Sequence, residues 1–298
     1  MRLITAVALA CLCASGTAAA DADRDSLPDA LEQELLERFL PRFMISARDC
    51  DVRPSEFRAG HSKPRAVSRN GTIYGQAFPA GPGEIELHFY HLWAKDCGLA
   101  PHPLDAEYVS ALLREAAPGK WRAVYWYAGA HEATICDASN GARADAIDGV
   151  DRGPAVWISD AKHATYLDRE RCRRGCGGDR CESMILLAPP RVVNLGEPGR
   201  PLNGAEWTAS GAWPLAAKMT PDFTPEVRAQ LDAAGGVVAV NRSIAPVKAV
   251  VLAGTNSVDA VALANTTTDR AVATSHGHTV RALGRAARAV GRWLGAGK

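Results

Sequence analysis

The chain of 298 residues is long enough to bury a substantial core, and its hydrophobic content of 47% is ordinary for a globular protein. Its formal net charge is only +1, whereas nucleic-acid-binding proteins are typically strongly basic, so no nucleic-acid partner is expected. After the first 20 residues no stretch is apolar enough to span a bilayer, so no transmembrane segment is expected in the mature chain.

The first 20 residues contain the three regions of a secretion signal. Arg2 supplies a positive charge, residues 3–12 form an apolar run, and residues 18–20 are alanines suited to cleavage. The run is shorter than the roughly 20 residues that a spanning helix needs, which favours cleavage over a membrane anchor. Lipidation of Cys11 is a weaker alternative. The sequence therefore predicts a signal peptide over residues 1–20 and a secreted or periplasmic protein.

The segment after the signal, residues 21–48, is predicted to be an acidic loop followed by a helix. Residues 21–32 place carboxylates at positions 1, 3, 5, 9 and 12 of a calcium loop, and Ser26 stands where such loops carry glycine. The pattern resembles the loops of dockerin and thrombospondin-type repeats. Alternatively, the acidic residues only complement the dipole of the following helix. The predicted second cation site consists of Asp21, Asp23, Asp25, Asp29 and Glu32.

The helix itself is indicated by apolar spacing. Leu27, Leu31, Leu35 and Phe39 recur at the interval of one helix face, and Pro41 closes the segment. A helix of about three turns is therefore expected between the acidic loop and the central part of the chain.

Removal of the signal takes Cys11 and Cys13 and leaves an even number of cysteines in an oxidising compartment, so disulfides are expected. Six cysteines allow 15 sets of pairings, among which the sequence does not choose. The set that we favour pairs Cys50 with Cys97, and Cys136 with one of the three closely spaced cysteines further along. Zinc bound by that trio is an alternative, although a fourth ligand is not obvious. The cysteines concerned are Cys50, Cys97, Cys136, Cys172, Cys176 and Cys181.

The central part, residues 49–215, has the pattern of an antiparallel β domain. Short runs rich in aromatic and β-branched residues alternate with turn-forming residues. Residues 107–116 contain good helix formers, but the turn at 117–120 favours a hairpin, and a strand is predicted there. In residues 84–93 the apolar side chains alternate with polar ones, which predicts a half-buried strand with His91 in the core. The other predicted strands are residues 71–77, 121–128, 154–159 and 183–187.

The C-terminal extension, residues 216–298, is predicted to be mixed and partly helical. Thr224 as N-cap and Pro225 at the first helical position predict one helix, and apolar runs follow at 236–240 and 247–253. Residues 280–294 form an amphipathic pattern with an arginine-rich face. Such a helix can make a peripheral contact with an anionic membrane or dock on the body of the protein.

The segment from Trp93 to Glu107 concentrates groups that bind cations. Asp105 and Glu107 share one face of a strand, and Asp96 and His102 precede them closely. Three carboxylates and one imidazole suit a hard divalent cation such as Ca²⁺, Mg²⁺ or Mn²⁺. The predicted metal ligands are Asp96, His102, Asp105 and Glu107.

At these residues the chain resembles the necrosis- and ethylene-inducing-like proteins and a related vacuolar-sorting-like family. Trp93, Lys95 and Asp96 match a W-Y-x-P-K-D element, and the three following ligands match an H-x-x-D-x-E motif. The resemblance spans roughly residues 70–215 and implies a metal-binding β-sandwich in which the four ligands surround a cation. Three positions depart from the pattern and weaken the expectation of cytolytic activity: Leu104, Ala106 and Glu132.

Three functions follow from this interpretation. The first is a secreted metal-binding protein that recognises an extracellular glycan or lipid headgroup through the cation. The second is a divalent-metal-dependent hydrolase, in which bound water is activated by a general base near the ion. The third is a structural envelope protein. The candidate catalytic residues for the second function are Asp105, His131, Glu132 and His163.

Overall fold

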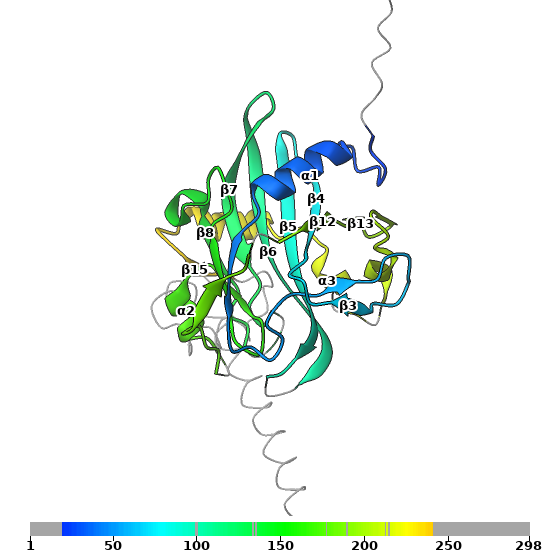
Figure 1. Ribbon diagram of the computed structural model, residues 1–298. Coiled ribbons are helices and arrows are strands. Elements are labelled where there is room, and N and C mark those ends of the chain that lie inside the picture. Colours follow the sequence, from blue (N-terminus) through cyan, green and yellow to red (C-terminus); the bar gives the residue numbers. More distant parts are fainter. Residues whose placement is uncertain are drawn as a thin grey trace, which may run out of the picture.

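The computed structural model describes residues 20–240, except 99, 100, 133, 135, 177, 189, 212 and 214. This part of the chain is mainly β, as predicted, and the helix α1 precedes the strands (Figure 1). Residues 1–19 of the predicted signal peptide, the apolar run at 247–253 and the predicted basic helix at 280–294 lie outside the described residues. No helix in the described part is long and apolar enough to cross a membrane.

A seven-stranded sheet occupies the centre of the described part, in the order β12-β4-β5-β6-β7-β8-β15. All its neighbouring strands are antiparallel except β12 and β4. Residues 107–116 are strand, and the hairpin to β7 turns at 117–120, as predicted. The strands are β4 Ile73–Gly81, β5 Glu84–Asp96, β6 His102–Ala117, β7 Lys120–Ala128, β8 Asn140–Arg143, β12 Val192–Asn194 and β15 Val238–Ala239.

A four-stranded sheet of order β10-β9-β1-β11 lies beside the large one. Its β1 and β9 are parallel, which departs from the antiparallel expectation. Parallel neighbours need a crossover connection, and here the strands of the large sheet supply it between β1 and β9. The four strands are β1 Arg42–Ser46, β9 Ala155–Ile158, β10 Thr165–Tyr166 and β11 Met184–Leu186.

Apolar side chains pack between the two sheets. Phe89, Val109 and Trp126 of the large sheet lie in one buried cluster with Phe43 of β1 and Val156 of β9. The helix α1, Asp29–Arg38, covers the same face and adds buried leucines to this cluster. The fold is therefore a β-sandwich whose inner layer is shared by both sheets and α1.

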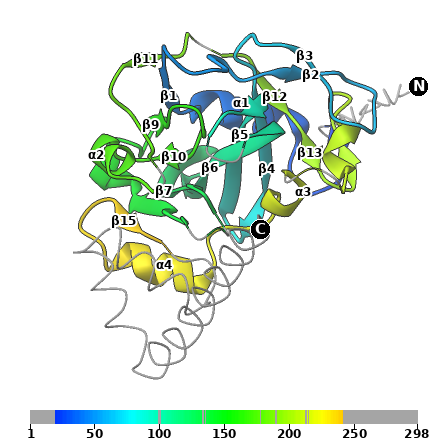
Figure 2. The ribbon, with the colours of Figure 1, turned by 90° about the horizontal axis from the view of Figure 1, so that it is seen from below.

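The opposite face of the large sheet is also buried, so β5 is not the half-buried strand that its alternation predicted. Tyr90 and Tyr108 pack on this face against Trp207, Trp213 and other apolar side chains of residues 205–231, the C-terminal segment. That segment covers residues which solvent would otherwise reach. In Figure 2 the four-stranded sheet and α3 lie on opposite sides of β5 and β6.

The remaining elements are short. The predicted helix after Thr224 is present as α4, and the Thr224 side chain caps it by accepting a hydrogen bond from the Val227 amide. Part of the C-terminal extension is thus helical, as expected, and α4 lies beside β15 at one edge of the molecule (Figure 2). These elements are β2 Glu56–Phe57, β3 Ala66–Ser68, η1 Ala144–Ile147, α2 Arg169–Arg173, β13 Gly196–Glu197, β14 Arg200–Pro201, η2 Glu206–Ala209, α3 Leu215–Lys218 and α4 Pro225–Asp232.

Three disulfides cross-link the described residues. The predicted pairing of Cys50 with Cys97 is confirmed, and so is the prediction that Cys136 joins the close trio, through Cys176. The two cysteines that remain, Cys172 and Cys181, pair with each other. With all three trio thiols oxidised, none is available as a zinc ligand.

Candidate metal centre

Three of the four predicted metal ligands meet where β5 ends and β6 begins. The strands pair so that Asp96 lies opposite His102, and Trp93 lies opposite Asp105. The potential ligand atoms of Asp96, His102 and Asp105 all lie within 4.8 Å of one another. The antiparallel register of β5 and β6 therefore builds a group that can hold a cation.

Local hydrogen bonds orient two of these ligands. The His102 Nδ1–H donates to the carbonyl oxygen of Leu104 at 3.2 Å, which leaves the lone pair of Nε2 for a metal. The Asp96 Oδ1 accepts from the Gly98 amide at 2.6 Å. His102 is exposed and Asp96 partly buried, so a cation held here would lie at the rim of the molecule.

The third ligand, Asp105, belongs to a buried charged triad. The fully buried His163 donates from Nδ1 to Asp105 Oδ2 at 2.8 Å and from Nε2 to Asp49 Oδ1 at 3.3 Å. Its ring stacks on Trp93 with a centroid distance of 3.8 Å. Burial lowers the pKa of His163, but the hydrogen bonds to the two carboxylates outweigh burial and raise that pKa to about 9. His163 is thus an imidazolium that fixes Asp105.

The fourth predicted ligand, Glu107, lies on the same face of β6 as Asp105 but has another partner. Its Oε2 accepts from the Lys218 ammonium at 2.9 Å, and the same ammonium donates to the carbonyl of Ala106. Burial raises the pKa of Glu107, although Lys218 acts in the opposite direction. The structure therefore brings Glu107 into an ion pair with α3 and leaves it outside the three-residue group.

His131 and Glu132, the other catalytic candidates, follow β7 and are held separately. The His131 Nε2 lies 2.9 Å from Asp179 Oδ2, and the Glu132 carboxylate accepts from the hydroxyls of Tyr127 at 2.8 Å and Tyr108 at 3.3 Å. His91, in contrast, is the core histidine that was predicted: it accepts from Trp93 Nε1 and bonds Thr165. The catalytic candidates are thus spread over different hydrogen-bond networks.

The pair of His131 and Asp179 predicts a pH dependence of stability. Burial lowers the pKa of His131, but the Asp179 carboxylate outweighs this and raises it above 6.5, with Glu107 acting in the same direction and Lys162 against it. The stabilisation should be complete below about pH 6.5 and be lost as pH rises through the raised folded-state pKa. We expect the difference in unfolding free energy between the wild type and His131→Gln to shrink from pH 6 to pH 9 in urea titrations. A difference that stays constant over this range would contradict the assignment.

Sequence reasoning missed Asp49 and Lys218, the groups that hold Asp105 and Glu107. For Asp49 a signal was present, because it adjoins Cys50, whose partner Cys97 adjoins Asp96. The predicted disulfide therefore already placed Asp49 near the metal ligands. Lys218 gave no comparable signal, since it lies on a short helix more than 100 residues from its partner in sequence.

The acidic residues of the N-terminal loop are also brought together. Asp21, Asp23 and Asp29 form one group of potential ligands, and Asp23, Asp25 and Glu32 form another. Burial, reinforced by the neighbouring carboxylates, raises the pKa of Asp23 to about 6 and that of Glu32 to about 8. Without a counter-charge, these carboxylates destabilise one another.

A further group of metal-type side chains, Glu86, His88 and Asp222, is buried beside the large sheet. Glu86 Oε1 lies 2.8 Å from His88 Nε2 and accepts from the Asp222 amide at 2.6 Å. The Asp222 carboxylate also accepts from the hydroxyls of Tyr108 and Ser110. These groups satisfy one another, and we interpret them as a structural polar network.

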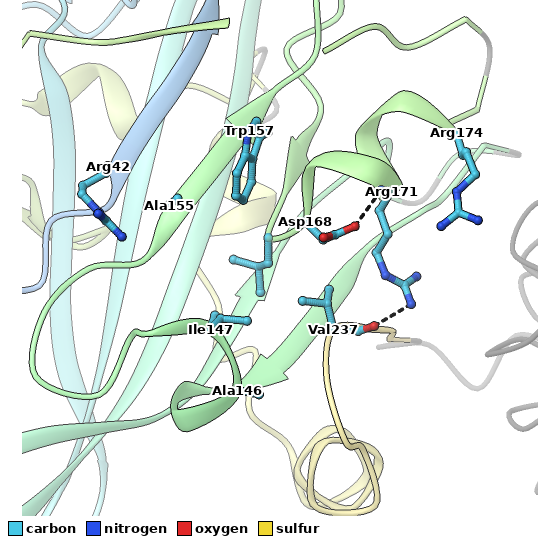
Figure 3. Close-up of a pocket in the computed structure, with 10 residues that line it drawn as sticks. Arg42, Ala146, Ile147, Ala155, Trp157, Asp168, Arg171, Arg174 and Val237 are labelled. Carbon is cyan, nitrogen blue, oxygen red and sulfur yellow. Dashed lines mark hydrogen bonds between the residues drawn. The ribbon is translucent and has the colours of Figure 1, made fainter. Parts of the chain in front are cut away.

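A cavity of about 490 Å³ lies away from the metal ligands and shares no residue with them. Three arginines and one aspartate, Asp168, line it together with Trp157 and smaller apolar side chains (Figure 3). Arg171 spans one side by donating to the carbonyl of Val237 at 2.6 Å. The cavity is thus basic, whereas the candidate metal centre is acidic.

No family model matches the chain, and no curated protein sequence matches it. Among solved structures it is similar to a mutant of NLPPya, with 14% identity and a TM-score of 0.39 over 60% of this chain and 79% of the other. It is also similar to NLPPya in complex with glucosamine, with 18% identity and a TM-score of 0.37 over 60% of this chain and 78% of the other. A third similar structure is Necrosis and Ethylene inducing Protein 2 from the causal agent of witches' broom disease of cocoa. The identity is 14% and the TM-score 0.36, over 63% of this chain and 86% of the other.

The chain is therefore distantly similar in structure to the necrosis- and ethylene-inducing proteins, the family that the motif around Asp105 resembles. With TM-scores below 0.5, this similarity carries no functional argument.

Proposed function

We propose that the protein is exported, holds a divalent cation at Asp96, His102 and Asp105, and uses this cation to recognise an extracellular glycan or lipid headgroup. Three disulfides support export, because such bonds persist in oxidising compartments. The proposal itself rests on the geometry of the candidate metal centre.

The observation that carries the proposal is the half-open ligand set at the rim. Hard divalent cations take six or more ligands, and the three side chains gathered here would leave about three positions to others. Because His102 is exposed, those positions would face solvent. Hydroxyl and phosphate oxygens are suitable donors for such a cation, and both occur in glycans and lipid headgroups.

The supporting groups favour a fixed rather than an adaptable site. Asp105 is held by the buried His163, and the Asp49 carboxylate on the far side of that ring also accepts the Asp51 amide at 3.0 Å and the Ala161 amide at 2.9 Å. Ligands that are oriented by outer partners lose less freedom on binding.

The test is binding of the purified protein to a glycan array and to vesicles with glycosylated or phosphorylated headgroups, with Ca²⁺, Mg²⁺ or Mn²⁺ and with EDTA. We expect binding that requires a cation and that weakens at least tenfold in Asp96→Asn and in His102→Gln. Both residues lie at the rim, so both variants should keep the thermal stability of the wild type. A matched control is Asp151→Asn, an exposed carboxylate that pairs with Arg122 elsewhere.

Two outcomes would count against the proposal: binding that persists in EDTA, or binding by the rim variants at wild-type strength. Glu107→Gln tests the fourth predicted ligand separately. If Glu107 leaves Lys218 to bind the cation, this variant should bind metal more weakly than the wild type. Unchanged metal affinity would assign Glu107 to the ion pair alone.

One observation favours the hydrolase as a second candidate. Glu107 lies on the same face of β6 as the ligand Asp105, so its carboxylate is placed to act as a general base on water bound to the cation. Turnover of an ester, phosphodiester or glycan panel by metal-loaded protein, lost in Glu107→Gln while metal affinity is retained, would support the hydrolase over the binding protein. A folded, metal-loaded sample without turnover would speak against it.

A further inference from the structure

The N-terminal acidic loop contains the most prominent unsatisfied polar groups in the described part of the chain. Asp23 is 2% exposed and Glu32 is fully buried. Neither oxygen of Asp23 has a hydrogen-bond partner among the described residues, and Glu32 has only one oxygen that does. The buried carboxylate oxygens without a partner are Asp21 Oδ1, Asp23 Oδ1, Asp23 Oδ2, Asp25 Oδ2 and Glu32 Oε1.

Protein groups nearby do not neutralise this charge. None of the ion pairs formed by described residues involves a carboxylate of the loop. Among the described residues, the one side-chain donor to these carboxylates is Asn194 Nδ2, which reaches Glu32 Oε2 at 3.0 Å. Burying an ionised carboxylate without a partner is costly, so these groups must either take up protons or meet a counter-charge that the described residues do not provide.

The loop backbone is arranged around the carboxylates. The amides of Ala22, Ser26 and Leu27 donate to Asp29, Asp21 and Asp25 respectively, at 2.8, 3.3 and 2.6 Å. These bonds occupy one oxygen of each carboxylate, and the unpartnered oxygens remain available to bind a cation. Ser26, at the position where calcium loops carry glycine, has a φ of 85°.

We propose that the loop of residues 21–32 binds one Ca²⁺ ion through Asp21, Asp23, Asp25, Asp29 and Glu32. Five carboxylates without a histidine or cysteine form an all-oxygen ligand set, and Ca²⁺ takes six to eight oxygens in flexible loops. The two groups of ligand atoms share Asp23, so a single ion beside Asp23 can reach both.

The ion would fasten α1 to the edge of the large sheet. Glu32 lies in the first turn of α1, and its donor Asn194 ends β12. Further along α1, Leu36 packs so closely on Gly75 of β4 that a Cβ at this glycine would lie 2.7 Å from it. A calcium ion at the start of α1 would therefore stabilise the packing of α1 on the sandwich core. It would do so independently of the rim site, which consists of Asp96, His102 and Asp105.

The test is calcium titration of the purified protein by calorimetry, together with thermal denaturation in Ca²⁺ and in EDTA. We expect saturating Ca²⁺ to raise Tm by roughly 5 °C or more, and Asp23→Asn and Glu32→Gln to lose this shift. In EDTA, Glu32→Gln should be at least as stable as the wild type, because glutamine is neutral and does not need to take up a proton in order to be buried beside the other carboxylates. Glu34→Gln, two positions away on the exposed face of α1, is the matched control and should keep the full shift.

A second variant keeps the proposal testable if the ligand variants fold poorly. Ser26→Gly removes the side chain from a left-handed backbone position that is already present without an ion, so it should raise Tm in Ca²⁺ and in EDTA alike and keep the full calcium shift. Asp96→Asn should leave the shift unchanged, since it alters only the rim site. Equal Tm in Ca²⁺ and EDTA, or a full shift in Asp23→Asn, would overturn the proposal.

Discussion

Replacing His163 by glutamine is expected to lower the free energy of unfolding by about 3–5 kcal/mol. The imidazolium lies between the Asp49 and Asp105 carboxylates and is completely buried. Glutamine keeps much of the volume but removes the positive charge, so two carboxylates would share a poorly solvated space without a cation. Urea unfolding in EDTA measures the change directly.

The matched control is His61→Gln, which makes the same substitution at an exposed histidine. It should change the unfolding free energy by less than about 0.5 kcal/mol. A cycle that combines His163→Gln with Asp49→Asn should show a coupling energy, because the double variant removes one of the two repelling charges. Equal stability of the His163 and His61 variants would show that the triad contributes no net electrostatic stabilisation.

Much of the fold was predictable because its signals are local. The spacing of Leu27, Leu31 and Leu35 predicts α1, and the turn at 117–120 predicts the hairpin that presents Asp105. The presence of disulfides followed from the even cysteine count, whereas their connectivity was not determined by the sequence. None of these inferences needed to know which distant segments pack together.

The prediction of a half-buried β5 failed where distant packing decides. His88 and Tyr90 alternate with apolar residues as on a solvent-facing side, yet the C-terminal segment covers them. The polar side chains of that face are satisfied by one another rather than by water, as when Tyr90 OH donates to Gln76 at 2.8 Å. Alternation alone cannot distinguish these two situations.

The candidate metal centre likewise combines residues that are close in sequence with residues from distant segments. Asp96, His102 and Asp105 are close in sequence and share one hairpin, so the motif suffices to bring them together. Lys218 and His163, which decide the charge state of the same region, come from segments far along the chain. Sequence therefore identifies the cation ligands better than it identifies the groups that orient them.

Removing the disulfide between Cys50 and Cys97, by Cys50→Ser together with Cys97→Ser, is expected to lower the free energy of unfolding by about 4 kcal/mol. The bond closes a loop with a sequence separation of 47 residues, and it restricts the unfolded chain accordingly. Cys50 is exposed, so the exchange of sulfur for oxygen adds little loss of packing there. Denaturant unfolding under non-reducing conditions provides the measurement.

The same pair of substitutions should also weaken cation binding at the rim. Cys50 lies between Asp49, which holds His163, and Asp51, which accepts the Ala94 amide at 3.0 Å; Cys97 adjoins the ligand Asp96. The disulfide therefore ties residues 49–51, which contact His163 and Ala94, to the end of β5 that carries the ligand Asp96.

The disulfide between Cys136 and Cys176 is the matched control, because its sequence separation of 40 residues gives nearly the same loop entropy. Replacing both of its cysteines by serine should cost a similar amount of stability but leave the cation affinity of the rim site unchanged. Both disulfide variants would lose affinity equally if stability alone governed the site. A loss confined to the variant lacking the Cys50 bond would instead show that this cross-link positions Asp96 and the support of Asp105.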